Sequence, residues 1–247
     1  MAKSSGLGDN FYIHGYDVSG DVNSISVSGG PAALSTTGID KSANERIGGL
    51  RTGGMTGTAF FNPDTDRAHP RLSSLPMTDV HGAYFRGTTL GNPAACQVSK
   101  QVNYDGTRGG DGAFTFAFDL QCNGFGVEWG RSLTAGVRTD TAATDGASID
   151  TTASEAFGAQ AYVQVMAFTG TDATITIEDS ADDATFAAVT GLAFTEVTAG
   201  PVAERIATAN DATVRRYLRV ATSTTGGFTE LAFAVVVIKN EIAGVVF

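Results

Sequence analysis

Hydrophobic and polar residues alternate with a period of two along much of the chain, which is the pattern of half-buried β-strands. In the clearest run, residues 114–122, Phe, Leu and Cys at even positions alternate with Thr, Ala, Asp and Gln at odd positions. A similar run covers 96–104, and the intervening "DGTRGGDG" has the composition of a turn. Further strands are predicted at 10–16, 22–28, 54–61 and 80–87, with a helical turn or two at 69–76.

The two clearest runs predict a hairpin whose strands are reflected about Gly109. In this register Tyr104 lies opposite Phe114, and the apolar side chains share one face of the sheet. Cys96 and Cys122 then become direct cross-strand neighbours on the core face, and we expect both to be free thiols. Two cysteines alone supply at most half of a zinc site, so they are interpreted as small buried hydrophobes.

The later part of the chain predicts a second group of strands. Residues 130–157 are rich in Thr, Ala, Asp and Gly and carry too little apolar surface to fold alone, which indicates a linker or an extended arm. Beyond it, the spacing is typical of a small sandwich, with strands at 159–168, 173–178, 184–189, 192–198, 201–208, 214–222 and 228–239. The predicted fold class is all-β. It has one sandwich or barrel domain in residues 1–150, with an arm at 1–10, and a smaller β-sandwich domain in residues 151–247.

Charge and hydropathy narrow the range of partners. The 247 residues include 16 Lys and Arg against 26 Asp and Glu, a net charge of −10. Without a basic tract, tight binding to nucleic acid phosphates is not expected. The longest apolar run, "LAFAVVVI" at 231–238, is shorter than the ~20 residues that cross a bilayer, and "MAKSSGLGDN" at 1–10 is not a signal segment. We expect no membrane contact and synthesis in a cytoplasm.

No constellation for catalysis, cofactor binding or metal binding is recognised. His14, His69 and His81 lack the i, i+4 spacing of a zinc-binding helix. The acidic stretches at 63–67 and 178–186 do not match the twelve-residue calcium loop, so they are interpreted as acidic turns. A Gly-x-Ser-x-Gly nucleophile elbow is also missing from the sequence. The prediction is a protein that is not an enzyme and uses no cofactor or metal.

A glycine-rich loop is predicted at 38–54. It lacks the lysine and the following helix of a P-loop, which argues against phosphate binding. Its few apolar residues suit anchors on a neighbouring subunit, and its charges suit pairs that set the register of that contact. We expect the loop to be mobile in a free subunit and ordered between subunits; the alternative is a loop folded back on its own domain. The predicted interface residues are Ile39, Asp40, Lys41, Glu45, Arg46, Ile47, Leu50 and Arg51.

Several longer strings resemble the major tail proteins of long-tailed bacteriophages. In the second half they are "VQVMAFTGTDATITIEDSADDATFAAVTGLAFTEV" at 163–197 and "AERIATANDATVRRYLRVATSTTGGFTELAFAVVVIKN" at 203–240. In the first half they are "GIDKSANERIGGLRTGGMTGTAFFNP" at 38–63, "HPRLSSLP" at 69–76 and "YFRGTTLGNPAACQVSKQVNYDGTRGGDG" at 84–112. The resemblance is one of order and spacing, and it covers nearly the whole chain.

The resemblance implies a tail-tube-like N-terminal domain and a structural role in the virion. The subunit would assemble with itself into stacked rings, hexameric by family resemblance, and with other tail proteins. The rings would form a conduit for ejected double-stranded DNA that passes without tight binding. The virion tail would be its location, after synthesis in the bacterial host. The alternatives are a capsid decoration protein, which forms small oligomers on a shell, and a carbohydrate-binding or adhesive β-sandwich module.

Overall fold

The computed structural model describes residues 5–243, and its regular structure is almost entirely β-strand. The strands form a branched twelve-stranded sheet and a separate four-stranded sheet. The helix α1 (Ala68–Leu72) overlaps the stretch where the sequence predicts a helical turn. The all-β fold class predicted from the sequence is confirmed.

Most strands lie close to the positions that the alternation predicts, but β8, β9 and β10 form where no strand is predicted. In the first part of the chain they are β1 (Asn10–Ile13), β2 (Tyr16–Asp17), β3 (Val22–Ser35), β4 (Arg46–Phe60), β5 (Val80–Phe85), β6 (Pro93–Arg108), β7 (Phe114–Cys122) and β8 (Glu128–Ser132). In the second part they are β9 (Arg138–Asp140), β10 (Ile149–Asp150), β11 (Ala159–Gly170), β12 (Thr174–Ser180), β13 (Ala187–Ala193), β14 (Val202–Ala207), β15 (Tyr217–Ser223) and β16 (Phe228–Lys239). The two strands predicted at 184–189 and 192–198 are one strand, β13. It continues through Gly191, whose positive φ of 89° suits a bulge that only glycine adopts easily.

Strands β11 and β16 pair along their whole length in the middle of the large sheet. Side chains of β16 such as Phe233 and Val235 face the four-stranded sheet, and their neighbours Ala234 and Val236 face the first part of the chain. Because both faces are covered, the run at 231–238 is continuously apolar rather than alternating.

Three hydrophobic cores follow from this arrangement. A sandwich core lies between the four-stranded sheet (β10-β15-β12-β13) and β11 and β16. A second core lies among β1, β4, β7 and α1. The third, which we call the junction core, is shared between the two parts of the chain; its largest members include Tyr12, Phe85, Tyr162, Val236 and Ile238.

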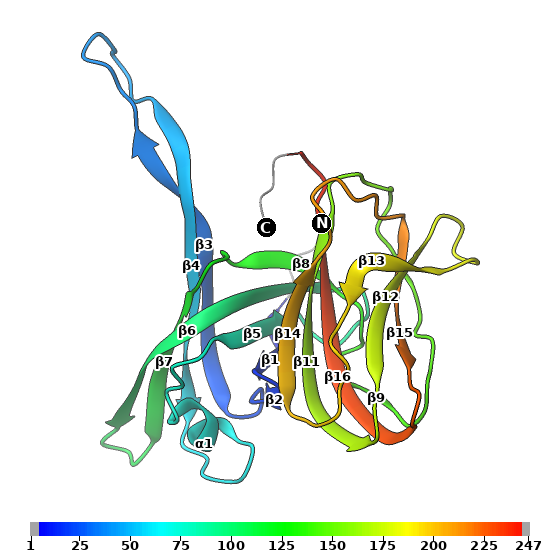
Figure 1. Cartoon of the computed structure of the whole chain (residues 1–247). Helices are drawn as coiled ribbons and strands as arrows, with labels where there is room; N and C mark the ends of the chain where they lie inside the picture. Colours follow the sequence, from blue (N-terminus) through cyan, green and yellow to red (C-terminus); the bar gives the residue numbers. More distant parts are fainter. Residues whose placement is uncertain (1–4, 244–247) are drawn as a thin grey trace.

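Strands β3 and β4 form a long hairpin that projects from the body of the molecule (Figure 1). Their pairing runs from Val22 opposite Ala59 to Ser35 opposite Arg46, whereas β7 pairs with β4 only over Gly54–Phe60. Residues 46–54, which the sequence assigns to a loop, are therefore strand. The alternation that identifies a strand is hidden there because the glycines carry no side chains.

The register predicted for the β6–β7 hairpin is wrong. Strand β6 pairs with β7 from Arg108 opposite Phe114, so the turn lies at 109–113, and Tyr104 lies opposite Phe118 instead of Phe114. A β-bulge between Gln101 and Asn103 then shifts the pairing back by one residue, so Gln101 lies opposite Leu120. Turn composition did not locate the tip, and the bulge leaves no signal in a pattern of alternation.

The wrong register also misplaces the cysteines. Cys122 lies opposite Ser99, and its Sγ donates a hydrogen bond to Oε1 of Gln97 at 3.2 Å. Cys96 is an odd number of residues from Ser99, so it points to the other face of β6, into the junction core. The two thiols are free, as expected, but they are not neighbours.

The polar segment 130–157 does not run free of the body. Within it, β9 pairs with β16 and β10 pairs with β15. Leu133 and Ile149 are buried in the sandwich core. The few apolar residues of this segment thus pack into the sandwich core of the second part of the chain. The division into two domains at residue 150 stays a prediction.

Candidate interaction surfaces

The eight residues predicted for a subunit interface all lie on the β3–β4 hairpin, with Arg51 nearest its base. Four are in the connection at 36–45 and four are on β4, and all eight are exposed. The exposed fractions are 109% for Ile39, 57% for Ile47 and 86% for Leu50. The sequence reasoning missed Leu34, which lies opposite Ile47 and is 49% exposed. We call Leu34, Ile39, Ile47 and Leu50 the hairpin aliphatics.

The charges of the hairpin are only partly paired within the chain. Lys41 Nζ lies 3.6 Å from Glu45 Oε1 and 3.9 Å from Asp40 Oδ2. Arg46 and Arg51 make no ion pair with any residue between 5 and 243. The outer hairpin therefore presents apolar side chains beside Arg46, whereas the Arg51 side chain lies against Gly126 at the base of the hairpin.

An aromatic cluster lies at the opposite end of the same strands. Its members are Phe61, His69, Tyr104, Phe114 and Phe116. The rings of Tyr104 and Phe116 stack with centroids 4.3 Å apart, and Phe61 lies 4.6 Å from His69 and 5.6 Å from Phe114. Phe61 is 41% exposed and Phe114 40% exposed, so the rings form a surface and not only a core. The sequence pattern placed Tyr104, Phe114 and Phe116 on one face of a hairpin. It did not place Phe61, which follows β4, or His69 of α1 with them.

The outward face of β3, β4 and β7 is rich in hydroxyl groups. Ser24 lies opposite Thr58, and Thr56 lies opposite both Ser26 and Asp119. These cross-strand pairs share a face because opposed side chains point the same way. The outward side chains over 24–28, 56–58 and 115–121 include no lysine or arginine. Over these residues the face has hydrogen-bonding capacity and no positive charge; the nearest lysine, Lys100 of β6, lies opposite Gln121 and pairs with Asp79.

A buried ion pair joins the two parts of the chain. Arg205 of β14 donates two hydrogen bonds to the carboxylate of Glu128 on β8, at 2.8 and 2.9 Å. The same carboxylate accepts from Tyr162 at 2.5 Å and from Gln160 at 2.9 Å. Burial by itself would raise the pKa of Glu128, but the hydrogen bonds and the charge of Arg205 outweigh it and lower that pKa. The Arg205 guanidinium also lies 3.7 Å above the Phe125 ring.

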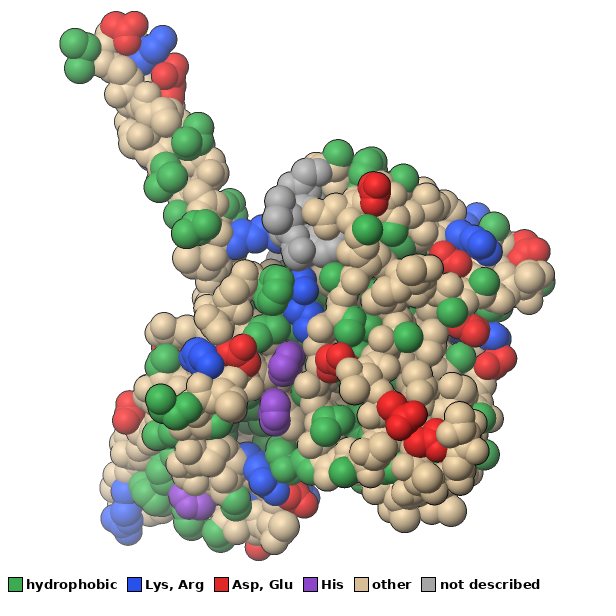
Figure 2. Space-filling view, viewed as in Figure 1, with side chains coloured by type: hydrophobic (Ala, Val, Ile, Leu, Met, Phe, Trp, Pro, Cys, Tyr) green, Lys and Arg blue, Asp and Glu red, His purple; other side chains and the backbone are tan. Residues whose placement is uncertain are grey.

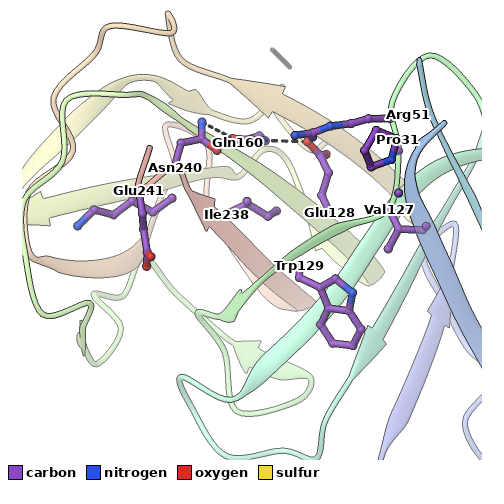
Figure 3. Close-up of a pocket in the computed structure, with 13 residues that line it drawn as sticks. Pro31, Arg51, Val127, Glu128, Trp129, Gln160, Ile238, Asn240 and Glu241 are labelled. Atoms are coloured by element: carbon purple, nitrogen blue, oxygen red, sulfur yellow. Dashed lines mark hydrogen bonds between the residues drawn. The ribbon is translucent and has the colours of Figure 1, made fainter. Parts of the chain in front are cut away.

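A hollow of about 500 Å³ lies beside this network, between the base of the hairpin and the end of β16. Figure 3 shows Arg51 reaching from the hairpin toward Glu128, with Trp129 at the edge of the hollow. Trp129 is 53% exposed. Within residues 5–243, no group of three or more His, Cys, Asp or Glu side chains is placed to hold a metal ion. No helix in that range is long and apolar enough to cross a membrane.

Two histidines meet where the two parts of the chain abut, and they are visible as neighbouring side chains in Figure 2. The rings of His14 and His81 stack with centroids 5.9 Å apart. Beside them, the Gly15 amide donates to Oε1 of Gln164 on β11 at 2.6 Å. Burial, followed by the charge of His14, lowers the pKa of His81 to about 4. Burial also lowers the pKa of His14.

Comparison with known proteins gives no family for this chain. No family model matches it, and no curated protein matches it. Among solved structures, it is similar to a chain of the virion of a native gene transfer agent particle. The identity is 11%, the match covers 51% of this chain and 98% of that chain, and the TM-score is 0.42.

Two further solved structures are similar to the chain. One is from the tail of an empty gene transfer agent particle with C6 symmetry, with 12% identity, 50% of this chain and 96% of that chain covered, and a TM-score of 0.39. The other is the SPP1 Dit (gp 19.1) protein of the hub adsorption apparatus in phages that infect Gram-positive hosts. Here the identity is 12%, the coverage is 93% of this chain and 98% of that chain, and the TM-score is 0.33. At TM-scores below 0.5, these similarities establish neither a common fold nor a function.

Proposed function

We propose that the chain is a structural subunit of a phage tail that assembles with copies of itself into stacked rings around a channel for DNA. The observation that carries the proposal is the outer β3–β4 hairpin with its exposed hairpin aliphatics. A two-stranded ribbon is only marginally stable in water, because nothing covers its apolar side chains. A partner that covers them would stabilise the ribbon, and a second copy of the chain meets that need.

Repeated contacts between unlike surfaces build rings or stacks. When one surface of a subunit binds a different surface of the next, each new subunit leaves another free surface, so growth closes into a ring or continues as a filament. Strand β3 adds to this capacity because it pairs only with β4, which leaves its other edge unpaired within the described residues. Such an edge pairs readily with a strand of another chain.

The outward face of β3, β4 and β7 suits the wall of the channel. Its serine and threonine hydroxyls keep the face hydrated, and Asp119 repels phosphate. Because the face carries no lysine or arginine over the residues named above, DNA would pass without being held. Six copies per ring, contacts with other tail proteins and a location in the virion tail follow from the family resemblance. The absence of enzymatic activity follows from the missing catalytic motifs, and all four remain predictions.

Sedimentation and negative-stain microscopy of the purified protein test the proposal. We expect rings, stacks or open-ended tubes at micromolar concentration, or assembly once an initiating tail component is added. Leu50→Asp should block assembly without lowering the unfolding temperature, because Leu50 is 86% exposed in the subunit. Ala184→Asp, an exposed change in the loop before β13, is the matched control and should assemble like the wild type.

Hydrogen exchange supplies an independent readout. Amides at 46–54 should exchange faster in the dissociated subunit than in the assembly. A protein that stays a strict monomer, and is also missing from purified tails, would contradict the proposal. Small closed oligomers that never stack would instead favour the capsid decoration protein.

A further inference from the structure

We propose that the aromatic cluster is the acceptor surface for the hairpin aliphatics of a second copy of this chain. The inference rests on the proposed function and adds the second half of the contact. Exposed groups of large apolar side chains commonly mark binding sites, and aromatic rings are enriched at the centres of interfaces. In the cluster, the rings of Phe61 and Phe114 are about 40% exposed, and Phe116 contacts both. His69 also contacts Phe61, and Tyr104 stacks on Phe116.

The two surfaces cannot meet within one chain. Leu50 and Phe60 lie toward opposite ends of β4, and ten residues of strand at about 3.3 Å each separate them by about 33 Å. Figure 1 shows the hairpin tip and the β6–β7 tip pointing away from each other. A twofold dimer could join these two surfaces only by pairing both ends of each copy at once, which would close the assembly at two chains. A head-to-tail contact instead joins the aliphatic end of one copy to the aromatic end of the next and leaves the other ends free, so it repeats along a stack as the proposed function requires.

The charges at the two ends are complementary. Arg46 and Arg51 of the hairpin have no ion-pair partner between residues 5 and 243. At the aromatic end, three carboxylates and two arginines lack an ion pair in that same range, which leaves an excess of negative charge: Asp64, Asp105, Asp111, Arg67 and Arg108. Opposite potentials steer the encounter and fix its register, and a guanidinium also binds well over an exposed ring. A second copy therefore fits both the apolar and the charged part of the surface.

A mixing experiment tests the direction of the contact. Leu50→Asp removes the donor surface and Phe114→Asp removes the acceptor surface. We expect each variant alone to need at least about tenfold more protein for assembly than the wild type, because each has lost a central apolar contact. When the two are mixed, the intact hairpin of the Phe114→Asp protein can bind the intact aromatic cluster of the Leu50→Asp protein. No further contact of this kind is then possible, so growth stops at two layers. Ala184→Asp should leave assembly unchanged.

A crosslinking experiment checks the contact without a destabilising charge. A mixture of Leu50→Cys protein and Phe114→Cys protein, treated with a short bismaleimide, should give one crosslinked dimer. The chain with both changes should give a ladder. Wild-type protein controls for its own thiols, of which Cys96 is buried and Cys122 half-buried. Should Phe114→Asp prove unfolded by its melting curve, Phe61→Ser replaces it in the mixing experiment.

The outcomes separate the two proposals. If the wild type assembles, while Phe114→Asp assembles at the same concentration and the cysteine mixture gives no dimer, the acceptor is elsewhere and the tail role stands. If the wild type never assembles, the proposed function fails and this contact fails with it.

Discussion

At the scale of single residues, the buried Glu128–Arg205 pair makes it energetically costly to separate the two parts of the chain. Both side chains are more than nine-tenths buried, and each carboxylate oxygen of Glu128 accepts at least two hydrogen bonds. A buried pair of this kind gains little over a well-packed apolar pair, but removing one partner leaves a charge without compensation. The pair thus penalises any arrangement in which β8 and β14 separate.

Glu128→Gln is expected to lower the free energy of unfolding by about 3–5 kcal/mol, because it leaves the Arg205 charge buried and unpaired. The double change Glu128→Leu with Arg205→Met should lose clearly less than that. Urea denaturation followed by the fluorescence of Trp129, the only tryptophan, measures both. Asp150→Asn, which breaks an exposed pair with Arg216, is the control and should have a much smaller effect. An equal loss in the single and the double variant would contradict this reasoning.

His81 gives the fold a dependence on pH. Its pKa is about 4 in the folded protein against 6.5 in the unfolded chain, so the unfolded state binds more protons between these values. The contribution of neutral His81 to the free energy of unfolding is fully present above pH 6.5 and is lost as the pH falls toward 4. The groups around the ring reinforce this: His14 stacks on it, and Arg205 lowers its pKa further, while Asp79 only partly opposes them.

Between pH 7.5 and pH 5, this histidine alone should lower the free energy of unfolding by about 2 kcal/mol. Denaturation of wild type and His81→Gln at both pH values isolates the contribution, since carboxylates titrate alike in the two proteins. His69→Gln, outside the pair, serves as the matched control and should keep the wild-type dependence. An equal loss of stability on acidification in His81→Gln and in the wild type would contradict the role of His81 in this pH dependence.

At the scale of elements, alternation located most strands but not their partners. The strands at 10–13, 80–85, 159–170 and 228–239 were found because a half-buried or fully buried strand has a recognisable apolar pattern. The hairpin register was not, because the turn and the bulge near Val102 depend on tertiary contacts. The misjudged turn displaces the pairing at Tyr104 by four residues, an even number that leaves the faces unchanged. The bulge makes the displacement odd beyond it, which is why Cys96 and Cys122 point to opposite faces.

The projecting hairpin shows a second limit of sequence reasoning. The composition of 38–54 identified the right residues for an interface but the wrong conformation, because glycine erases the alternation by which a strand is recognised. Gly53 is required by packing as well as by freedom of the backbone: a β-carbon there would lie 2.5 Å from the carbonyl oxygen of Ser28. Only part of the aromatic cluster had a sequence signal. Alternation placed Tyr104, Phe114 and Phe116 on one face, whereas Phe61 and His69 join them only in the folded chain.

At the scale of the whole molecule, the cores bear on where the chain divides. The sandwich core draws Leu133 and Ile149 from the segment that the sequence predicts as a linker, and the rest of its buried members come from beyond residue 158. The junction core instead belongs to both parts, since Tyr162 and Val236 pack with Tyr12 and Phe85. The second part thus holds one complete core and one face that needs a cover.

Two fragments test this division. Residues 128–243 keep β9, β10 and the whole of the sandwich core apart from the contact of Leu90, so we expect cooperative unfolding. Residues 156–240 lack Leu133 and Ile149. Burial of each large apolar side chain contributes about 1.5–3 kcal/mol to the free energy of unfolding, and the shorter fragment lacks both contributions. The shorter fragment should therefore show no cooperative transition.

In both fragments the uncovered faces of Tyr162 and Val236 should promote association, which Val236→Thr would reduce. Thermal melts and sedimentation measure these properties, and a shorter fragment that unfolds as cooperatively as the longer one would mean that the segment 130–157 is dispensable.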